Sequence, residues 1–152
     1  MMRLRVRLVA IALLVFAAGT ACQATQLAVI VDKGNASGGV TSAELTKIFK
    51  FESRKWTDGR AVVLVMRKPI APEVQEALQK LCKMREDEFS TTVASHRASI
   101  VFVGSEEEVM KTVSSTPGAV GLVDVYSINS RVNVLKLDGK LPLEPGYALR
   151  GN

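Results

Sequence analysis

The sequence has little of what metalloenzymes and nucleophilic enzymes use. It holds one histidine, two cysteines and 5% aromatic residues among 152 positions. With no second histidine or cysteine at ligand spacing, neither a metal site nor a nucleophile beside its base is indicated. We therefore expect no metal, no cofactor and no catalytic residue, and we interpret the chain as a non-enzymatic protein.

Long hydrophobic runs are also missing. The longest, from Leu8 to Ala18, is shorter than the roughly 20 apolar residues that span a bilayer. Three arginines precede it and small residues follow up to Ala24, which is the order of a secretory signal peptide. We predict a signal peptide at residues 1–24 and one periplasmic or otherwise extracytoplasmic domain at residues 25–152. A retained anchor is the alternative.

The two cysteines bear on how the exported chain is processed. Small residues allow cleavage after Ala21 or after Ala24, and the first cut would leave Cys22 at the new N-terminus, where a lipid anchor could be attached. A disulfide between Cys22 and Cys82 is the other use of the pair in an oxidising compartment. Because Cys82 lies on the apolar face of a predicted helix, a buried free thiol is the better interpretation.

Most of the positive charge belongs to the predicted signal peptide. The formal net charge is +5, and removing three arginines leaves 17 basic against 15 acidic residues. A nearly balanced surface with few aromatic residues lacks the basic patch that nucleic acids require. No nucleic-acid partner is expected.

Short apolar strands alternate with amphipathic helices along the rest of the chain. This order predicts an α/β domain with right-handed crossovers and a mostly parallel sheet covered by helices on both faces. Two polar-to-acidic segments, at Thr41–Glu44 and Ser105–Glu108, have the spacing of capping boxes. The predicted strands are 27–31, 62–66, 100–103 and 119–124, with an edge strand at 132–137; the predicted helices are 42–51, 72–82, 85–95 and 105–113.

The best candidate for a binding loop follows the second strand. In open α/β sheets, ligands bind beyond the carboxyl ends of the strands, which is where Arg67 and Lys68 fall. A guanidinium facing the N-terminus of the helix that begins at Pro72 would offer donors to a phosphate-like anion. Pro72 itself lacks an N–H, and Glu73 adds a negative charge, so a plain connection is the alternative.

Four other features of the sequence have a functional and a structural interpretation. The glycine-rich loop from Asn35 to Gly39 permits close backbone approach to a ligand but is also a flexible connection without phosphate-loop spacing. Trp56 is an anchoring side chain rather than a ligand platform. His96 and Arg97 are either an anion clamp or a solvated loop. The acidic run Glu106–Glu108 is interpreted as helix capping.

The order of these segments resembles the phosphate-binding proteins of bacterial ABC importers. The resemblance covers Leu27 to Asp124 and is most specific in two motifs, Leu45-x-x-Ile48-Phe49 with Trp56, and Pro117-Gly118-Ala119-Val120-Gly121. It implies a single lobe of the type II periplasmic-binding-protein fold. Relatives carry an arginine and then a Ser-Gly-Thr segment that holds phosphate; this chain keeps Arg67 and has 69–72 as Pro-Ile-Ala-Pro.

The resemblance implies an exported, non-catalytic solute-binding domain that binds phosphate or a related oxyanion, with an ABC permease or another envelope protein as partner. The alternative is a cell-envelope protein-interaction module that kept the fold and lost the ligand. The residues expected to bind the ligand are Arg67, Lys68, Asn35, Ser37, Gly38 and Gly39.

Overall fold

The computed structural model describes residues 25–150. The predicted signal peptide, its two cleavage positions and Cys22 lie outside this range. Within it, no helix has the length and apolar character needed to cross a bilayer. Cys82 is a buried free thiol, as predicted, and its burial raises its pKa.

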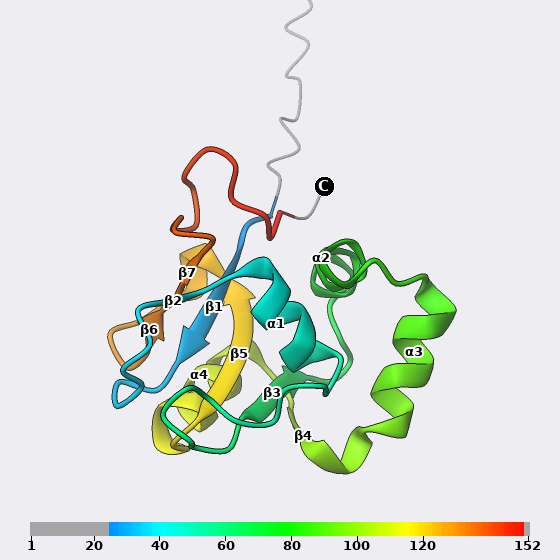
Figure 1. Ribbon diagram of the computed structural model, residues 1–152, viewed down its shortest axis with the longest axis horizontal. Coiled ribbons are helices and arrows are strands. Elements are labelled where there is room, and N and C mark those ends of the chain that lie inside the picture. The colour runs from blue at the N-terminus through cyan, green and yellow to red at the C-terminus, as the bar shows by residue number, and fades with distance from the viewer. Residues whose placement is uncertain (1–24, 151–152) are drawn as a thin grey trace, which may run out of the picture.

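A five-stranded sheet forms the centre of the fold (Figure 1). The strands lie in the order β4-β3-β5-β1-β6, and a two-stranded sheet of β2 and β7 lies beside them. The predicted core strands are confirmed to within one residue, and the predicted edge strand is divided in two. The bounds are β1 Leu27–Val31, β2 Gly39–Val40, β3 Val63–Arg67, β4 Ile100–Val103, β5 Ala119–Asp124, β6 Asn133–Val134 and β7 Lys136–Leu137.

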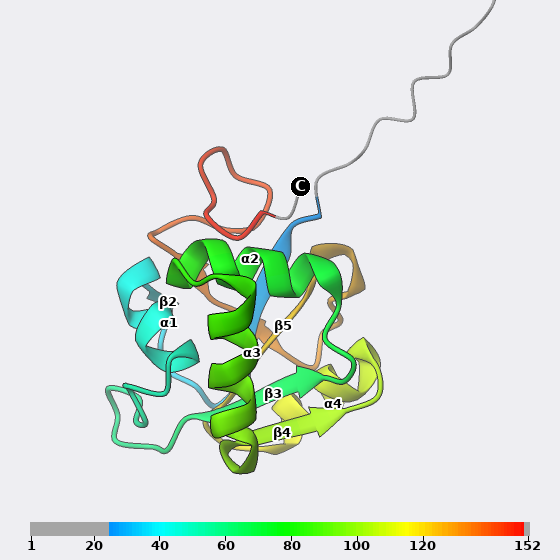
Figure 2. The ribbon, with the colours of Figure 1, turned by 90° about the vertical axis from the view of Figure 1, so that its right-hand side faces the viewer.

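Helices cover both faces of the sheet, which confirms the predicted α/β class. Alternate strand residues face opposite sides, so Val29 packs with α1, α2 and α3 while Ile30 packs with α4. Helices α1, α2 and α3 therefore lie on one face of the sheet and α4 lies on the other. Figure 2 shows α2 and α3 in front of the sheet. The bounds are α1 Ser42–Phe49, α2 Pro72–Cys82, α3 Glu86–Ser95 and α4 Glu106–Ser115, with short 3₁₀ turns at Arg97–Ser99 and Val125–Ser127.

Of the two predicted capping boxes, the one at α1 is complete, and the one at α4 has only its serine half. Thr41 and Glu44 form a reciprocal capping box at the start of α1. The Ser105 hydroxyl accepts a hydrogen bond from the Glu108 N–H at 3.2 Å at the start of α4. These contacts satisfy N–H groups that a first helical turn otherwise leaves without partners, which is why the two helices begin where the sequence indicates.

The direction of β1 differs from the expected mostly parallel sheet. Strands β3, β4 and β5 are parallel, but β1 is antiparallel to both of its neighbours, β5 and β6. The end of β1 and the start of β3 lie at the same edge, since Val31 pairs with Val120 and Val63 with Ala119. The segment containing α1 therefore begins and ends at one edge, and the next strand runs in the opposite direction.

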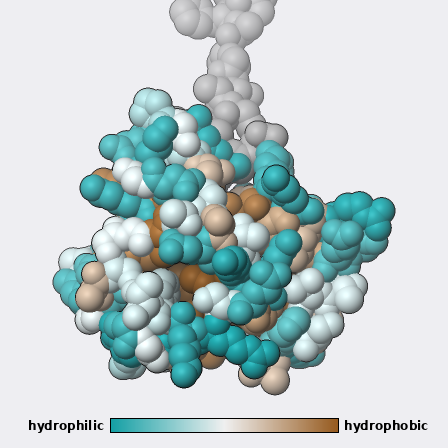
Figure 3. Space-filling model, viewed as in Figure 1, coloured by the Kyte–Doolittle hydropathy of each residue, from teal (hydrophilic) through white to brown (hydrophobic). Residues whose placement is uncertain are grey.

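The last residues of the described range pack back onto β1. The Tyr147 hydroxyl donates to the Leu27 carbonyl at 2.7 Å, and the Leu27 N–H donates to the Leu149 carbonyl at 3.1 Å. Burial raises the pKa of Tyr147. Figure 3 shows hydrophobic side chains gathered at the centre of one face, over β1 and β5, with hydrophilic ones around them. The tail therefore belongs to the folded domain.

Gly121 allows α4 to approach the sheet closely. A Cβ at this position would lie 2.8 Å from Val109 Cγ1 and 3.3 Å from Val113 Cγ2. Both are β-branched helix residues with little rotamer freedom, so neither side chain can move aside easily. The absence of a side chain at Gly121 therefore lets α4 pack directly against β5.

We expect Gly121→Ala to lower the free energy of unfolding by about 1–3 kcal/mol through overpacking. Urea unfolding followed by circular dichroism measures the loss. Gly38→Ala is the matched control, because a Cβ there meets no atom within 4 Å. Equal stability of the two variants would contradict this account of the α4 contact.

Candidate functional site

The carboxyl ends of the three parallel strands lie at one edge of the sheet. Arg67 is the last residue of β3 and pairs with Val103, the last residue of β4, while Asp124 ends β5 beside the start of β1. Helices α2 and α4 begin just beyond β3 and β4. Two helix N-termini and Arg67 therefore meet at this edge, as the sequence predicts.

A shallow pocket lies at this edge. Its volume is about 20 Å³, enough for about one water molecule, and it opens to solvent. The half-buried Arg67 lines it together with Ala71, the N-cap residue of α2, and Glu106, in the first turn of α4. Apolar side chains from α1, α2 and the strands form most of the remaining wall. These other lining residues are Phe49, Val65, Met66, Ile70, Val74 and Leu122.

The electrostatics of the pocket favour an anion on the α2 side. The Arg67 Nε–H donates to the Pro69 carbonyl over a long 3.5 Å, and Arg67 takes part in no ion pair within residues 25–150. No side chain caps α2, so amide groups of its first turn remain available. Lys68 is exposed beside Arg67.

The α4 side of the pocket is acidic. The Glu106 carboxylate accepts the Asp124 N–H at 3.1 Å, and the Glu108 carboxylate accepts the Gly104 N–H at 2.6 Å. Glu108 therefore bonds the backbone just before α4, as expected of a capping residue, whereas Glu106 bonds the end of β5. Because both carboxylates place negative charge at the start of α4, an anion is favoured only near Arg67 and the start of α2.

The glycine-rich loop lies at the opposite edge of the sheet from Arg67. It follows the carboxyl end of β1, and β1 runs antiparallel to β5. The expectation that Asn35, Ser37, Gly38 and Gly39 join Arg67 and Lys68 around one ligand is therefore wrong. Ser37 and Gly39 line a separate open pocket, together with Lys47, Lys55 and Trp56.

The Asn35 side chain forms its hydrogen bond within its own loop. Its side-chain oxygen accepts the Ser37 N–H at 2.9 Å, which closes a local turn. Its amide nitrogen is buried without a hydrogen-bond partner. Asn35 is therefore a structural residue of this loop in the described chain.

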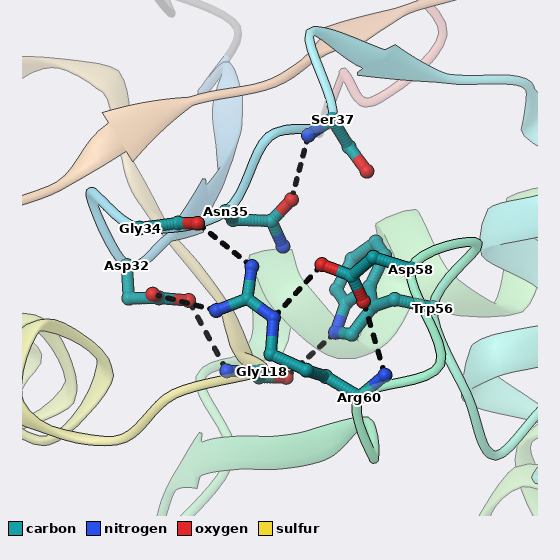
Figure 4. Close-up of polar contacts among 8 residues, drawn as sticks. All are labelled: Asp32, Gly34, Asn35, Ser37, Trp56, Asp58, Arg60 and Gly118. Carbon is teal, nitrogen blue, oxygen red and sulfur yellow. Dashed lines mark hydrogen bonds and ion pairs between the residues drawn. The ribbon is translucent and has the colours of Figure 1, made fainter.

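A buried polar network joins this loop to the strands beside it (Figure 4). The Asp32 carboxylate accepts the Gly118 N–H at 3.2 Å and lies 3.5 Å from Arg60 Nη1. The Trp56 indole donates to the Gly118 carbonyl at 2.8 Å, which confirms Trp56 as an anchor. Arg60 also donates to the Gly34 carbonyl. Its backbone N–H and its Nε–H both donate to the Asp58 carboxylate, and these two hydrogen bonds lower the pKa of Asp58.

Sequence analysis missed Asp32 and Arg60. The available signal was a carboxylate placed directly after an apolar strand, where burial demands a partner. The other candidate pair, His96 and Arg97, does not form a clamp: the His96 ring stacks on Phe51, with centroids 4.2 Å apart, and Arg97 is exposed.

No protein-family model and no curated protein sequence matches this chain. Solved structures do: the ABC-type phosphate transport receptor from Vibrio cholerae superposes with a TM-score of 0.71 at 17% identity, over 84% of this chain and 54% of that one. The chain has the fold of phosphate-binding proteins. PstS from Borrelia burgdorferi gives a TM-score of 0.70 at 19% identity, over 85% of this chain and 55% of PstS.

The name of a third similar structure states that phosphate is bound to it. The putative phosphate ABC transporter substrate-binding protein with bound phosphate from Clostridium perfringens has a TM-score of 0.62 at 18% identity, over 76% of this chain and 46% of that one. The chain spans about half the length of these proteins. The shared part is a single mixed α/β lobe, and at these identities the likeness concerns the fold alone.

We expect Asp32→Ala to lower the free energy of unfolding by about 1–3 kcal/mol, because it leaves the buried Gly118 N–H without an acceptor. Asp58→Ala is the matched control, since Asp58 also bonds Arg60 but is exposed. Its effect should be much smaller. Thermal and urea unfolding measure both, and a larger loss in Asp58→Ala would refute the structural role of Asp32.

Proposed function

We propose that the chain is an exported, non-catalytic domain that binds phosphate or a related oxyanion at the carboxyl-end pocket. The observation that carries this proposal is the Arg67 guanidinium, which has no carboxylate partner in the described chain and lies beside the uncapped N-terminus of α2. A planar guanidinium presents two parallel N–H donors to an oxyanion, and a helix N-terminus adds amide donors and a favourable dipole.

The same residues limit the affinity that we expect. Pro72 contributes no N–H, Glu73 adds a negative charge to the first turn of α2, and Glu106 lines the facing wall. Lys68 supplies a second cation, but it is exposed and therefore screened by solvent. The loop around Ser37 lies at the other edge and takes no part. We expect a dissociation constant near 1 mM, which corresponds to about 4 kcal/mol.

Export and partnership are parts of the same proposal. The residue order of segment 1–24 supports a cleaved secretory signal, with lipid attachment at Cys22 as a further proposal. The similar structures are named as receptors and substrate-binding proteins of phosphate transport, which supports an extracytoplasmic location and a permease partner. Because these similar structures are named as binding proteins of transport systems, they also support a role without catalysis.

One observation favours a protein-interaction module as the second candidate. The Tyr126 side chain is 77% exposed just beyond β5, and Leu143 is 52% exposed where its N–H bonds Gln26 beside the start of β1. Both apolar side chains lie at the edge that holds the pocket. Tyr126→Ser would remove binding of an envelope protein under this candidate, whereas Arg67→Ala would leave it intact.

We expect isothermal titration at low salt to detect millimolar phosphate binding that Arg67→Ala abolishes, because the variant loses the only arginine that lines the pocket within residues 25–150. Arg131→Ala is the matched control: Arg131 is exposed and precedes β6 at the opposite edge of the sheet. Heat should decrease as ionic strength rises. Absence of both heat and thermal stabilisation at millimolar phosphate would exclude this ligand.

A further inference from the structure

A second concave site lies between α3 and the sheet. It is an open groove with a volume of about 460 Å³. Figure 2 shows α3 running down the front of the domain, with α2 above it and β4 near its lower end. The groove is lined by residues of α3, the loop after β3, the edge strand β4 and one residue of α2.

The lining of the groove is mainly apolar. Phe89 and Val93 project from α3, Phe102 comes from the edge strand β4, and Ile70 comes from the loop after β3. Ile70, Val93 and Phe102 are only half-buried, so they leave apolar surface open to solvent. Concave apolar surface with a few polar groups is the usual composition of a site for an organic ligand.

The charged groups of the groove are both cations and lie at its two ends. Lys68 is next to the carboxyl end of β4, where its N–H donates to the Val103 carbonyl, and Arg97 begins the turn that leads into the amino end of β4. Neither takes part in an ion pair within the described residues. No acidic side chain lines the groove. Its electrostatic potential therefore favours an anion.

The backbone that leads into the amino end of β4 is held by His96, the residue before Arg97. The His96 ring stacks on Phe51 with the two planes 4° apart, and the His96 backbone N–H donates to the Thr92 carbonyl at 3.2 Å. At the other end, Lys68 Nζ lies 5.7 Å from the centroid of the Phe102 ring, over the apolar floor. A ligand that covers this ring would meet the ammonium group.

We propose that this groove binds an amphipathic carboxylate, a molecule with an aliphatic or aromatic body and an anionic end. The apolar lining accounts for the body and the unpaired cations account for the carboxylate. Inorganic phosphate has no apolar surface to bury and so gains nothing from Phe102 or Val93. The proposal does not rest on phosphate binding, because Arg67 lines the other pocket and not this groove.

Titration of the ¹⁵N-labelled protein with octanoate, followed by amide chemical shifts, tests the proposal. We expect saturable shifts along α3 and β4, and weaker binding of octyltrimethylammonium, which has the same chain and the opposite charge. Arg97→Gln should weaken octanoate binding by about two- to fivefold, the effect of one exposed ion pair. Arg97→Glu should remove the preference for octanoate over the cation. Arg131→Gln should change neither.

Several results would overturn the proposal. Equal affinity for octanoate and octyltrimethylammonium would show apolar partition without charge recognition. Shifts confined to residues around Arg67, or no saturable shifts at all, would also overturn it. Arg67→Ala separates the two sites: it should abolish phosphate binding and leave octanoate binding unchanged, so that either site can fail while the other is confirmed.

Discussion

The fold depends on the Asp32 carboxylate, which is buried at the point where three strands meet. Asp32 directly follows β1. Its carboxylate accepts a hydrogen bond from the Gly118 N–H, just before β5, and lies beside the guanidinium of Arg60, which precedes β3. A carboxylate taken out of water is tolerated only with partners, so each of these contacts requires the others. Trp56 completes the arrangement through the Gly118 carbonyl, which also accepts the Val63 N–H. The end of β1 and the starts of β3 and β5 are thereby held at one edge.

This constraint decides where binding groups gather. Because β1 ends at the edge where β3 and β5 begin, its loop lies far from the carboxyl ends of those strands. Arg67 and the N-termini of α2 and α4 occupy one edge, and the Asn35–Gly39 loop occupies the other. The charged groups of the carboxyl edge are then divided between Arg67 and the acidic first turn of α4, so the local potential is positive on one side and negative on the other.

Much of the fold could be predicted from the sequence because its signals are local. The capping threonine at 41, the apolar spacing from Val74 to Cys82 and the continuous apolar runs at Leu27–Val31 and Ala119–Asp124 define helices and strands whatever surrounds them. Strand direction is different. A strand buried on both faces has the same apolar run whether it is parallel or antiparallel, so Leu27–Val31 could not reveal its orientation.

The candidate site was predictable to the same extent. Arg67 was identified because its place depends only on the end of its own strand, whereas its supposed partners in the Asn35–Gly39 loop depended on the orientation of β1. The pairing of Asp32 with Arg60 was not predicted because the two residues are 28 positions apart in the sequence. The groove beside α3 was not predicted because it depends on how α3 packs against β4.

The contact between the tail and β1 brings the two ends of the described range together. Gln26 and Arg150 form an antiparallel bridge, beside the bond from the Leu27 N–H to the Leu149 carbonyl. The two ends of residues 25–150 thus lie side by side, so a short peptide could join them. A circular permutant that joins these two ends and opens the connection between α2 and α3, which carries no strand pairing, would keep every strand pairing of the sheet.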